Sequence, residues 1–305
     1  MAEQHTTNTI AIIKSQTPSR VCKEYSTKSG DLEKVAVAKI SNGLVTHRDL
    51  PDAQAMVAIL EKVCDTEDLA VVSGAWRGAN SKVFKLVDES TLIYQFGKDR
   101  VKNMVSVQGE GKDAICARLK RCIDPSVWLL LDADNPAGIH PEWAEMDIQA
   151  RCELLEPIIK GISKCERIEL RSSSSRVHKE GEEAGKRTHA WVRVSDPDKI
   201  AALREHVKVQ MVLRDLSFAS PRYSRKTGKA ISPEHRTVFD LAVWTHGRLV
   251  FCSKPDVSEA EGYVCADADV TIVNEGAGAL NIDKIELPTD TILNKYKKKT
   301  GSALT

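Results

Sequence analysis

Hydrophobic and polar positions along the chain predict an α/β unit in the first 125 residues. Short apolar runs typical of strands alternate with apolar residues at helical spacing. After Asp49 or Asp52, with Pro51 in the first turn, an apolar face at Met56, Leu60 and Val63 indicates a helix. A second helix is expected at 114–122, and strands are expected at 35–40, 70–72, 82–86 and 91–96.

The stretch from 126 to 265 predicts a more regular order of elements. Val127–Leu131 is an apolar run that indicates a buried strand ending at Asp132. A helix is expected at about 141–159 and another from Pro197, with further strands at 166–170, 188–194, 238–243 and 248–252. Strand–helix–strand–strand–helix–strand is the order of a ferredoxin-like or RRM-like sheet.

These patterns predict an α/β (α+β) protein in three parts. Residues 1–125 form the N-terminal α/β unit, packed on an RRM-like catalytic core at 126–265. Residues 266–305 are expected to be an extension, mostly loop, with a mobile basic tail at Lys295–Lys299.

Composition limits the classes of function. The hydrophobic fraction of 42% is ordinary for a globular protein, and the formal net charge of +1 means that any basic surface must be local. None of the eight cysteines forms a Cys-x-x-Cys pair, so we expect no structural zinc. The polar N-terminus and the absence of a long apolar run predict reduced thiols, a cytoplasmic location and no membrane partner.

Asp132 and Asp134 are the most informative residues, because they follow a buried strand and stand one residue apart. Side chains two apart on a strand point the same way, so their charges repel. A divalent cation such as Mg²⁺ or Mn²⁺ removes that repulsion and can join a carboxylate pair to a phosphate. The plainer interpretation is a strand end followed by solvated turn residues.

Three further features accompany the acidic pair. His189 begins an expected strand beside two cations and could bind a phosphate, although a lone histidine in a strand is more often structural. Asp240 lies inside an apolar run, where carboxylates are rare unless paired or metal-bound, or else it is a surface position. The serine-rich loop, flanked by Arg171 and Arg176, offers the donors that a triphosphate needs, or is a linker; its serines are Ser172, Ser173, Ser174 and Ser175.

A basic stretch from 214 to 236 precedes Asp240 and could bind a template strand or a triphosphate, or be a solvated face. Its candidate DNA-binding residues are Arg222, Arg225, Lys226 and Lys229. A second Asp-x-Asp, Asp267 and Asp269, is a weaker metal candidate, because no matching His and Asp follow it.

The order of Asp132-x-Asp134, Thr188-His189 and Phe239-Asp240, at intervals of about fifty residues, resembles the three motifs of the archaeo-eukaryotic primase superfamily, the primase-polymerases. The serine-rich loop and the stretch Arg236–Phe251 are similar to primase domains of phages, plasmids and integrative elements. The segment Val21–Lys34 is similar to their leader. The resemblance covers most of residues 20–285.

The resemblance implies template-directed nucleotidyl transfer with two Mg²⁺ or Mn²⁺ ions held by Asp132, Asp134 and Asp240. Nucleoside triphosphates are the implied substrate, gripped by the serine-rich loop, Arg176 and His189, with Arg248 as a further candidate. Single-stranded DNA is the implied template, and a replicative helicase domain or protein is a further partner in many relatives.

Two alternatives stay open. A nicking-type replication initiator shares an RRM-like core, but it needs a His-hydrophobic-His motif, and no His-x-His occurs here. A catalytically inactive single-stranded-DNA-binding module on the same fold is the second, and metal titration distinguishes it from an enzyme.

Overall fold

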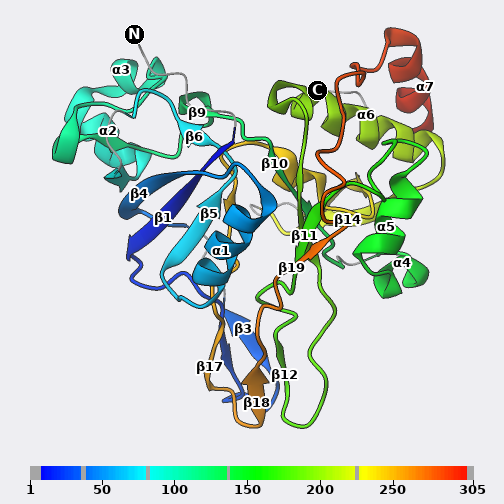
Figure 1. Ribbon diagram of the computed structural model, residues 1–305, viewed down its shortest axis with the longest axis horizontal. Helices are drawn as coiled ribbons and strands as arrows, with labels where there is room; N and C mark the ends of the chain where they lie inside the picture. Colours follow the sequence, from blue (N-terminus) through cyan, green and yellow to red (C-terminus); the bar gives the residue numbers. More distant parts are fainter. Residues whose placement is uncertain (1–7, 36–38, 80–82, 136–137, 224–226, 301–305) are drawn as a thin grey trace.

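The computed structural model of the protein describes residues 8–35, 39–79, 83–135, 138–223 and 227–300, and only the main chain at 112, 222 and 230–234. The architecture is mixed α/β, with a six-stranded and a four-stranded sheet side by side (Figure 1). Among the described residues, no helix is both long and apolar enough to cross a membrane.

The six-stranded sheet is buried on both faces because its central strand is apolar on both. In β1, Ile10 and Ile12 join one hydrophobic cluster, whereas Ala11 and Ile13 join another. The strand order is β16(Leu249–Val250), β5(Leu69–Val72), β1(Thr9–Thr17), β4(Asn42–Asp49), β7(Val83–Val87) and β8(Ile115–Cys116). Helix α1(Ala53–Cys64) packs on the first face, and α2(Glu89–Phe96) and α3(Lys98–Lys102) contribute to the second cluster.

The four-stranded sheet is antiparallel throughout, in the order β10(Trp128–Asp132), β13(His189–Arg193), β11(Arg167–Leu170) and β19(Thr271–Val273). Helices α5(Ile148–Leu155) and α6(Ile200–Leu213) pack against it. One hydrophobic cluster contains Met56 of α1, Leu130 of β10 and Leu203 of α6, so the two sheets share a continuous core. This core fixes the position of the β10 end relative to the N-terminal unit.

Smaller elements complete the fold. An arm built from the sheets β17-β2-β3 and β12-β18 extends below the two large sheets in Figure 1. Its strands are β2(Glu24–Ser26), β3(Glu33–Val35), β12(Val177–Lys179), β17(Asp256–Glu259) and β18(Tyr263–Cys265). The others are β6(Ala75–Trp76), β9(Ile123–Asp124), β14(Phe218–Tyr223), β15(Ala230–Arg236), α4(Pro141–Glu145), α7(Asp290–Thr300), and the 3-10 turns η1(Gly111–Asp113), η2(Lys120–Cys122), η3(Pro197–Lys199) and η4(Leu241–Trp244).

Local hydrogen bonds explain three departures from the sequence-based expectation. Residues 91–96, expected as a strand, belong to helix α2, because the Asp88 side chain accepts from the Thr91 amide and caps it. The helix expected at 141–159 divides into α4 and α5. The Asp147 side chain accepts from the Ala150 amide and caps α5, which begins at Ile148. The helix expected at 114–122 is replaced by β8 and η2.

The strand expected at 238–243 is also wrong. Asp240 instead caps η4 by accepting from the Ala242 amide. The next expected strand is β16, which pairs with β5 in the six-stranded sheet and not with β10.

The segment after 265 is more ordered than expected. It supplies β19 to the four-stranded sheet, and Lys295–Lys299 lie in α7, whose Tyr296 packs on Val209 and Val212 of α6. Each large sheet therefore combines strands from distant parts of the chain.

Candidate metal and nucleotide site

Asp132 and His189 face each other where β10 and β13 pair in antiparallel register. The His189 Nε2 lies 3.4 Å from the Asp132 Oδ1, and both side chains are about nine-tenths buried. Asp132 Oδ1 and His189 Nδ1 are buried atoms, and neither has a hydrogen-bond partner among the residues that the structure describes. Buried polar atoms are nearly always satisfied, so this pair is a place where a ligand is expected.

Asp134 lies just beyond the strand and is exposed. Desolvation raises the pKa of its carboxyl, and the negative charge of Asp132 raises it further; His189 and Lys23 act in the opposite direction. Its anionic form is thus disfavoured in the free protein. A cation bound between the two carboxylates would reverse that effect.

Asp240 lies beside Asp132 although its segment is not a strand. Its backbone N–H donates to the Asp132 carbonyl at 2.8 Å. Its carboxylate accepts from the Ala242 amide at 2.8 Å, and its negative charge helps to raise the pKa of Asp134. In the part of the chain that the structure describes, no three His, Cys, Asp or Glu side chains are already gathered around a metal position. The three predicted aspartates lie on adjoining segments, and their oxygen donors are of the kind that suits a hard divalent cation.

Arg151 connects the segments that carry these carboxylates. No pattern in the sequence predicted this role. Its guanidinium is buried and donates to the Val238 carbonyl and the Asn135 Oδ1, each at 2.6 Å, and to the Trp143 carbonyl at 2.9 Å. Asn135 follows Asp134 directly, and Val238 is two residues before Asp240. The burial of an arginine in an amphipathic helix depends on how the helix is rotated, which only packing determines.

We expect Arg151→Lys to weaken Mn²⁺ binding by about ten- to a hundredfold, because residues that orient metal ligands contribute that much to affinity. Lysine keeps the positive charge, but its single ammonium cannot donate to both segments as the planar guanidinium does. Titration calorimetry with Mn²⁺ measures the change.

Arg167→Lys is the matched control for that variant. Arg167 is equally buried, but it donates to the side chains of Glu169 and Gln149 rather than to the Asn135 and Val238 segments. Arg167→Lys should melt at a lower temperature but bind Mn²⁺ normally. Equal Mn²⁺ affinities for the two variants would contradict the positioning role.

The serine-rich loop follows β11 directly, next to His189, which pairs with Leu170. Ser172 and Ser175 bond each other, and the Ser173 hydroxyl donates to the Phe251 carbonyl. Ser174 instead accepts from the Lys23 ammonium at 2.6 Å. Ser174 is thus linked to the carboxylate pair through Lys23, because the Lys23 ammonium interacts electrostatically with Asp134 and Asp132.

The structure separates two predicted phosphate-binding residues from this cluster. Arg176 is fully buried and donates to the carbonyls of Cys64 and Ala266, each at 2.8 Å, which makes it a structural link between three segments. Arg248 is exposed at the start of β16, and its charge acts on Arg118. Two donors of the Arg176 guanidinium are therefore used by main-chain carbonyls within the fold.

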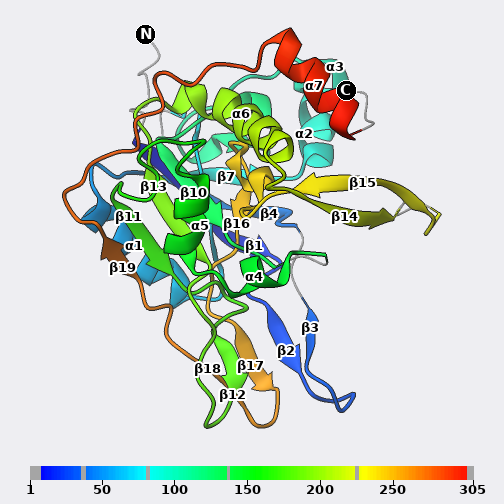
Figure 2. The same cartoon turned by 90° about the vertical axis from the view of Figure 1, so that its right-hand side faces the viewer.

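The basic stretch forms the β14–β15 hairpin, which projects from the body in Figure 2. Lys229 is exposed, Arg222 is described in its main chain only, and Arg225 and Lys226 lie outside the described residues. The hairpin base packs against α4, with the rings of Phe218 and Trp143 5.9 Å apart. Since α4 follows the Asp132–Asp134 segment, the hairpin rises close to the carboxylates.

The second Asp-x-Asp is an ion-paired surface group. Asp269 lies 2.9 Å from both Arg171 and Arg187, and the hydrogen bond from Arg187 contributes most to its lowered pKa. A carboxylate already neutralised by two guanidinium groups has little need of a metal.

No protein-family model, curated protein sequence or solved structure matches this chain. The functional assignment consequently depends on the geometry of the cluster formed by Asp132, Asp134, Asp240 and His189.

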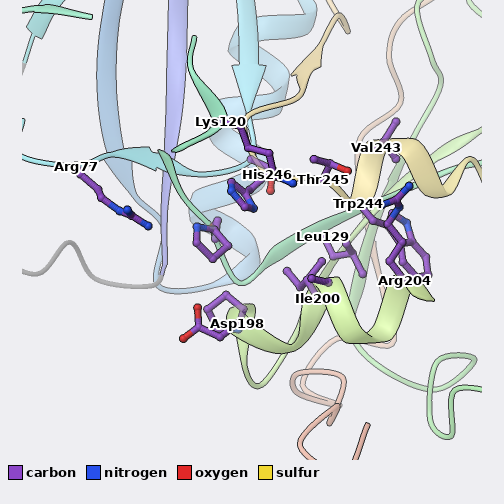
Figure 3. A pocket seen from close by; sticks show the side chains of 15 residues that line it. Arg77, Lys120, Leu129, Asp198, Ile200, Arg204, Val243, Trp244, Thr245 and His246 are labelled. Carbon is purple, nitrogen blue, oxygen red and sulfur yellow. The ribbon is translucent and has the colours of Figure 1, made fainter. Parts of the chain in front are cut away.

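A hollow of about 250 Å³ lies where the segment after β5 meets β10, η4 and the start of α6 (Figure 3). Arg77 and Arg204 stand at its two ends in that view. Arg77 is paired with Asp124 at 2.5 Å, and Arg204 donates to the Leu241 carbonyl and lies 3.7 Å from Glu205. Arg77 and Arg204 thus already have partners, and we assign the hollow no ligand.

Proposed function

We propose that the protein is a DNA primase-polymerase that transfers nucleotides onto a growing strand along a single-stranded template, in the replication of a mobile element or phage. The observation that supports it most is the juxtaposition of Asp132 with His189 across two paired strands and with Asp240 through a main-chain hydrogen bond. These are the residues of the three ordered motifs that resemble the primase-polymerases.

The strand arrangement supports an RRM-like core in the proposal. Strand β10, helices α4 and α5, strands β11 and β13, and helix α6 follow one another in the expected order, and β13 lies between β10 and β11. A fourth strand would pair with the free edge of β10. The segment before η4 lies at that edge and donates one hydrogen bond, from Asp240 to Asp132.

The residues present fit a pair of divalent cations. Asp132, Asp134 and Asp240 would hold the cations, which when bound neutralise phosphate charge and stabilise the attacking and leaving oxygens. His189 is placed to hold a phosphate oxygen beside Asp132, with Ser174 as a second donor. The hairpin β14–β15 would carry the template strand, because it projects beside the same end of β10.

The test is incubation with a single-stranded oligonucleotide, all nucleoside triphosphates and Mg²⁺ or Mn²⁺, followed by a sequencing gel. We expect products whose sequence depends on the template and which disappear when EDTA removes the metal. A binding module would retain the oligonucleotide without any product, and a nicking-type initiator would cleave it. Either result would refute polymerase activity.

A further inference from the structure

Lys23 reaches the candidate site from the N-terminal segment, about 110 residues before Asp132 in the sequence. Its Nζ donates to the Ser174 Oγ at 2.6 Å, and the side chain is half-buried. The ammonium therefore stands at the serine-rich loop, which follows the strand next to His189.

The main chain around Lys23 is fixed on both sides. The Asp256 amide donates to the Lys23 carbonyl at 2.9 Å, and the Val21 amide donates to the Glu67 carbonyl at 2.6 Å. Arg20 adds ion pairs to Glu67 and Asp256. These main-chain contacts position the Lys23 ammonium before any ligand binds. Such preorganisation lowers the entropy cost of binding.

The Lys23 ammonium also acts on the carboxylate pair. Its charge and that of His189 lower the pKa of Asp134, in opposition to desolvation and to Asp132. The Lys23 ammonium has lost part of its hydration through burial. A phosphate oxygen would restore a strong partner to it.

Both arginines that flank the serine-rich loop are committed to other groups. Arg171 binds Asp269 and the Gly185 carbonyl, and Arg176 binds two main-chain carbonyls. The loop therefore lacks a free guanidinium among its own flanking residues. The ammonium that donates to the half-buried Ser174 hydroxyl is contributed by a segment far away in the sequence.

We propose that Lys23, with Ser174, forms the binding site for the phosphate groups of the incoming nucleoside triphosphate. This inference rests on the proposed nucleotidyl transfer. The ammonium would exchange part of its hydrogen bonding with Ser174 for a phosphate oxygen, and it would neutralise part of the phosphate charge.

The experiment compares Lys23→Ala and Lys23→Met with Lys28→Ala as the matched control, a lysine that bonds Glu259 at 2.8 Å on the exposed arm. Three affinities are measured by calorimetry or fluorescence: Mn²⁺ alone, nucleoside triphosphate with Mn²⁺, and a labelled oligonucleotide without nucleotide. Melting temperatures show that the variants are folded.

We expect two changes of opposite sign. Loss of Lys23 should weaken triphosphate binding by about ten- to a hundredfold, because a charge-assisted phosphate contact is removed. It should strengthen Mn²⁺ binding, because a positive charge near Asp132 and Asp134 is removed. Oligonucleotide affinity and every property of Lys28→Ala should stay at the wild-type level.

Two results would overturn the inference. One is a Lys23 variant that binds triphosphate as Lys28→Ala does. The other is failure of both Lys23 variants to fold, which would show that the side chain is structural. Failure of the proposed function is separate: the wild-type protein would then bind no triphosphate with Mn²⁺ and synthesise nothing.

Discussion

Asp132→Asn should reduce metal-dependent synthesis by about a thousandfold or more while leaving the melting temperature unchanged or higher. The loss follows because metal stabilisation of a transition state is worth several kcal/mol, and each 1.36 kcal/mol is tenfold in rate. Stability is retained because the Asp132 Oδ1 has no hydrogen-bond partner in the described part of the chain and because the Asp132 charge opposes that of Asp134. Primer-extension rates and thermal denaturation of the same preparation measure both effects.

Asp269→Asn is the matched control, since Asp269 also ends an Asp-x-Asp but is paired with Arg171 and Arg187. It should lower the melting temperature and leave synthesis almost intact. Normal synthesis by Asp132→Asn would remove this aspartate from the metal site. A large fall in its melting temperature would instead assign it to the fold.

Arg176→Met should lower the melting temperature by about 6–20 °C. The guanidinium holds the carbonyls of Cys64 and Ala266 in a buried position. Hydrogen bonds from a charged group contribute about 1.5–3 kcal/mol each, so the loss is about 3–5 kcal/mol of unfolding free energy. In proteins of this size each kcal/mol shifts the midpoint by about 2–4 °C. Calorimetry or circular dichroism gives the shift.

The nucleotide KM of Arg176→Met, measured below its melting temperature, should match that of the wild type. Arg248→Met is the control, because Arg248 is exposed and its replacement should leave the melting temperature unchanged. A stable Arg176→Met protein with a raised KM would restore Arg176 to phosphate binding.

Local patterns in the sequence were sufficient to predict the strands that carry the acidic pair and the histidine. The apolar run before Asp132 forms β10, and β11 and β13 lie within the strands expected at 166–170 and 188–194. Asp52, one of the two expected caps, begins α1, and Asp196 caps η3 at the expected Pro197, since capping requires only residues two or three positions away. Antiparallel pairing of β10 and β13 then brings Asp132 opposite His189.

Residues 238–240 show where local patterns failed. The run Val238–Val243 has the composition of a strand, yet Val238 and Phe239 are buried in the shared core, and the Asp240 cap forms a 3-10 turn instead. Composition indicates burial, but hydrogen bonds to neighbours determine whether a buried segment becomes a strand.

The sequence by itself determined which residues carry carboxylate, imidazole and hydroxyl groups, and at which strand ends they lie. The tertiary structure alone decided that Lys23 joins Ser174 and that Arg151 joins the two acidic segments, whereas Arg176 is used within the fold. The physical reason is that a cation's role depends on which carbonyls, hydroxyls and charges surround it. Residue pairs such as 23 and 174 meet only after both sheets have packed on one core.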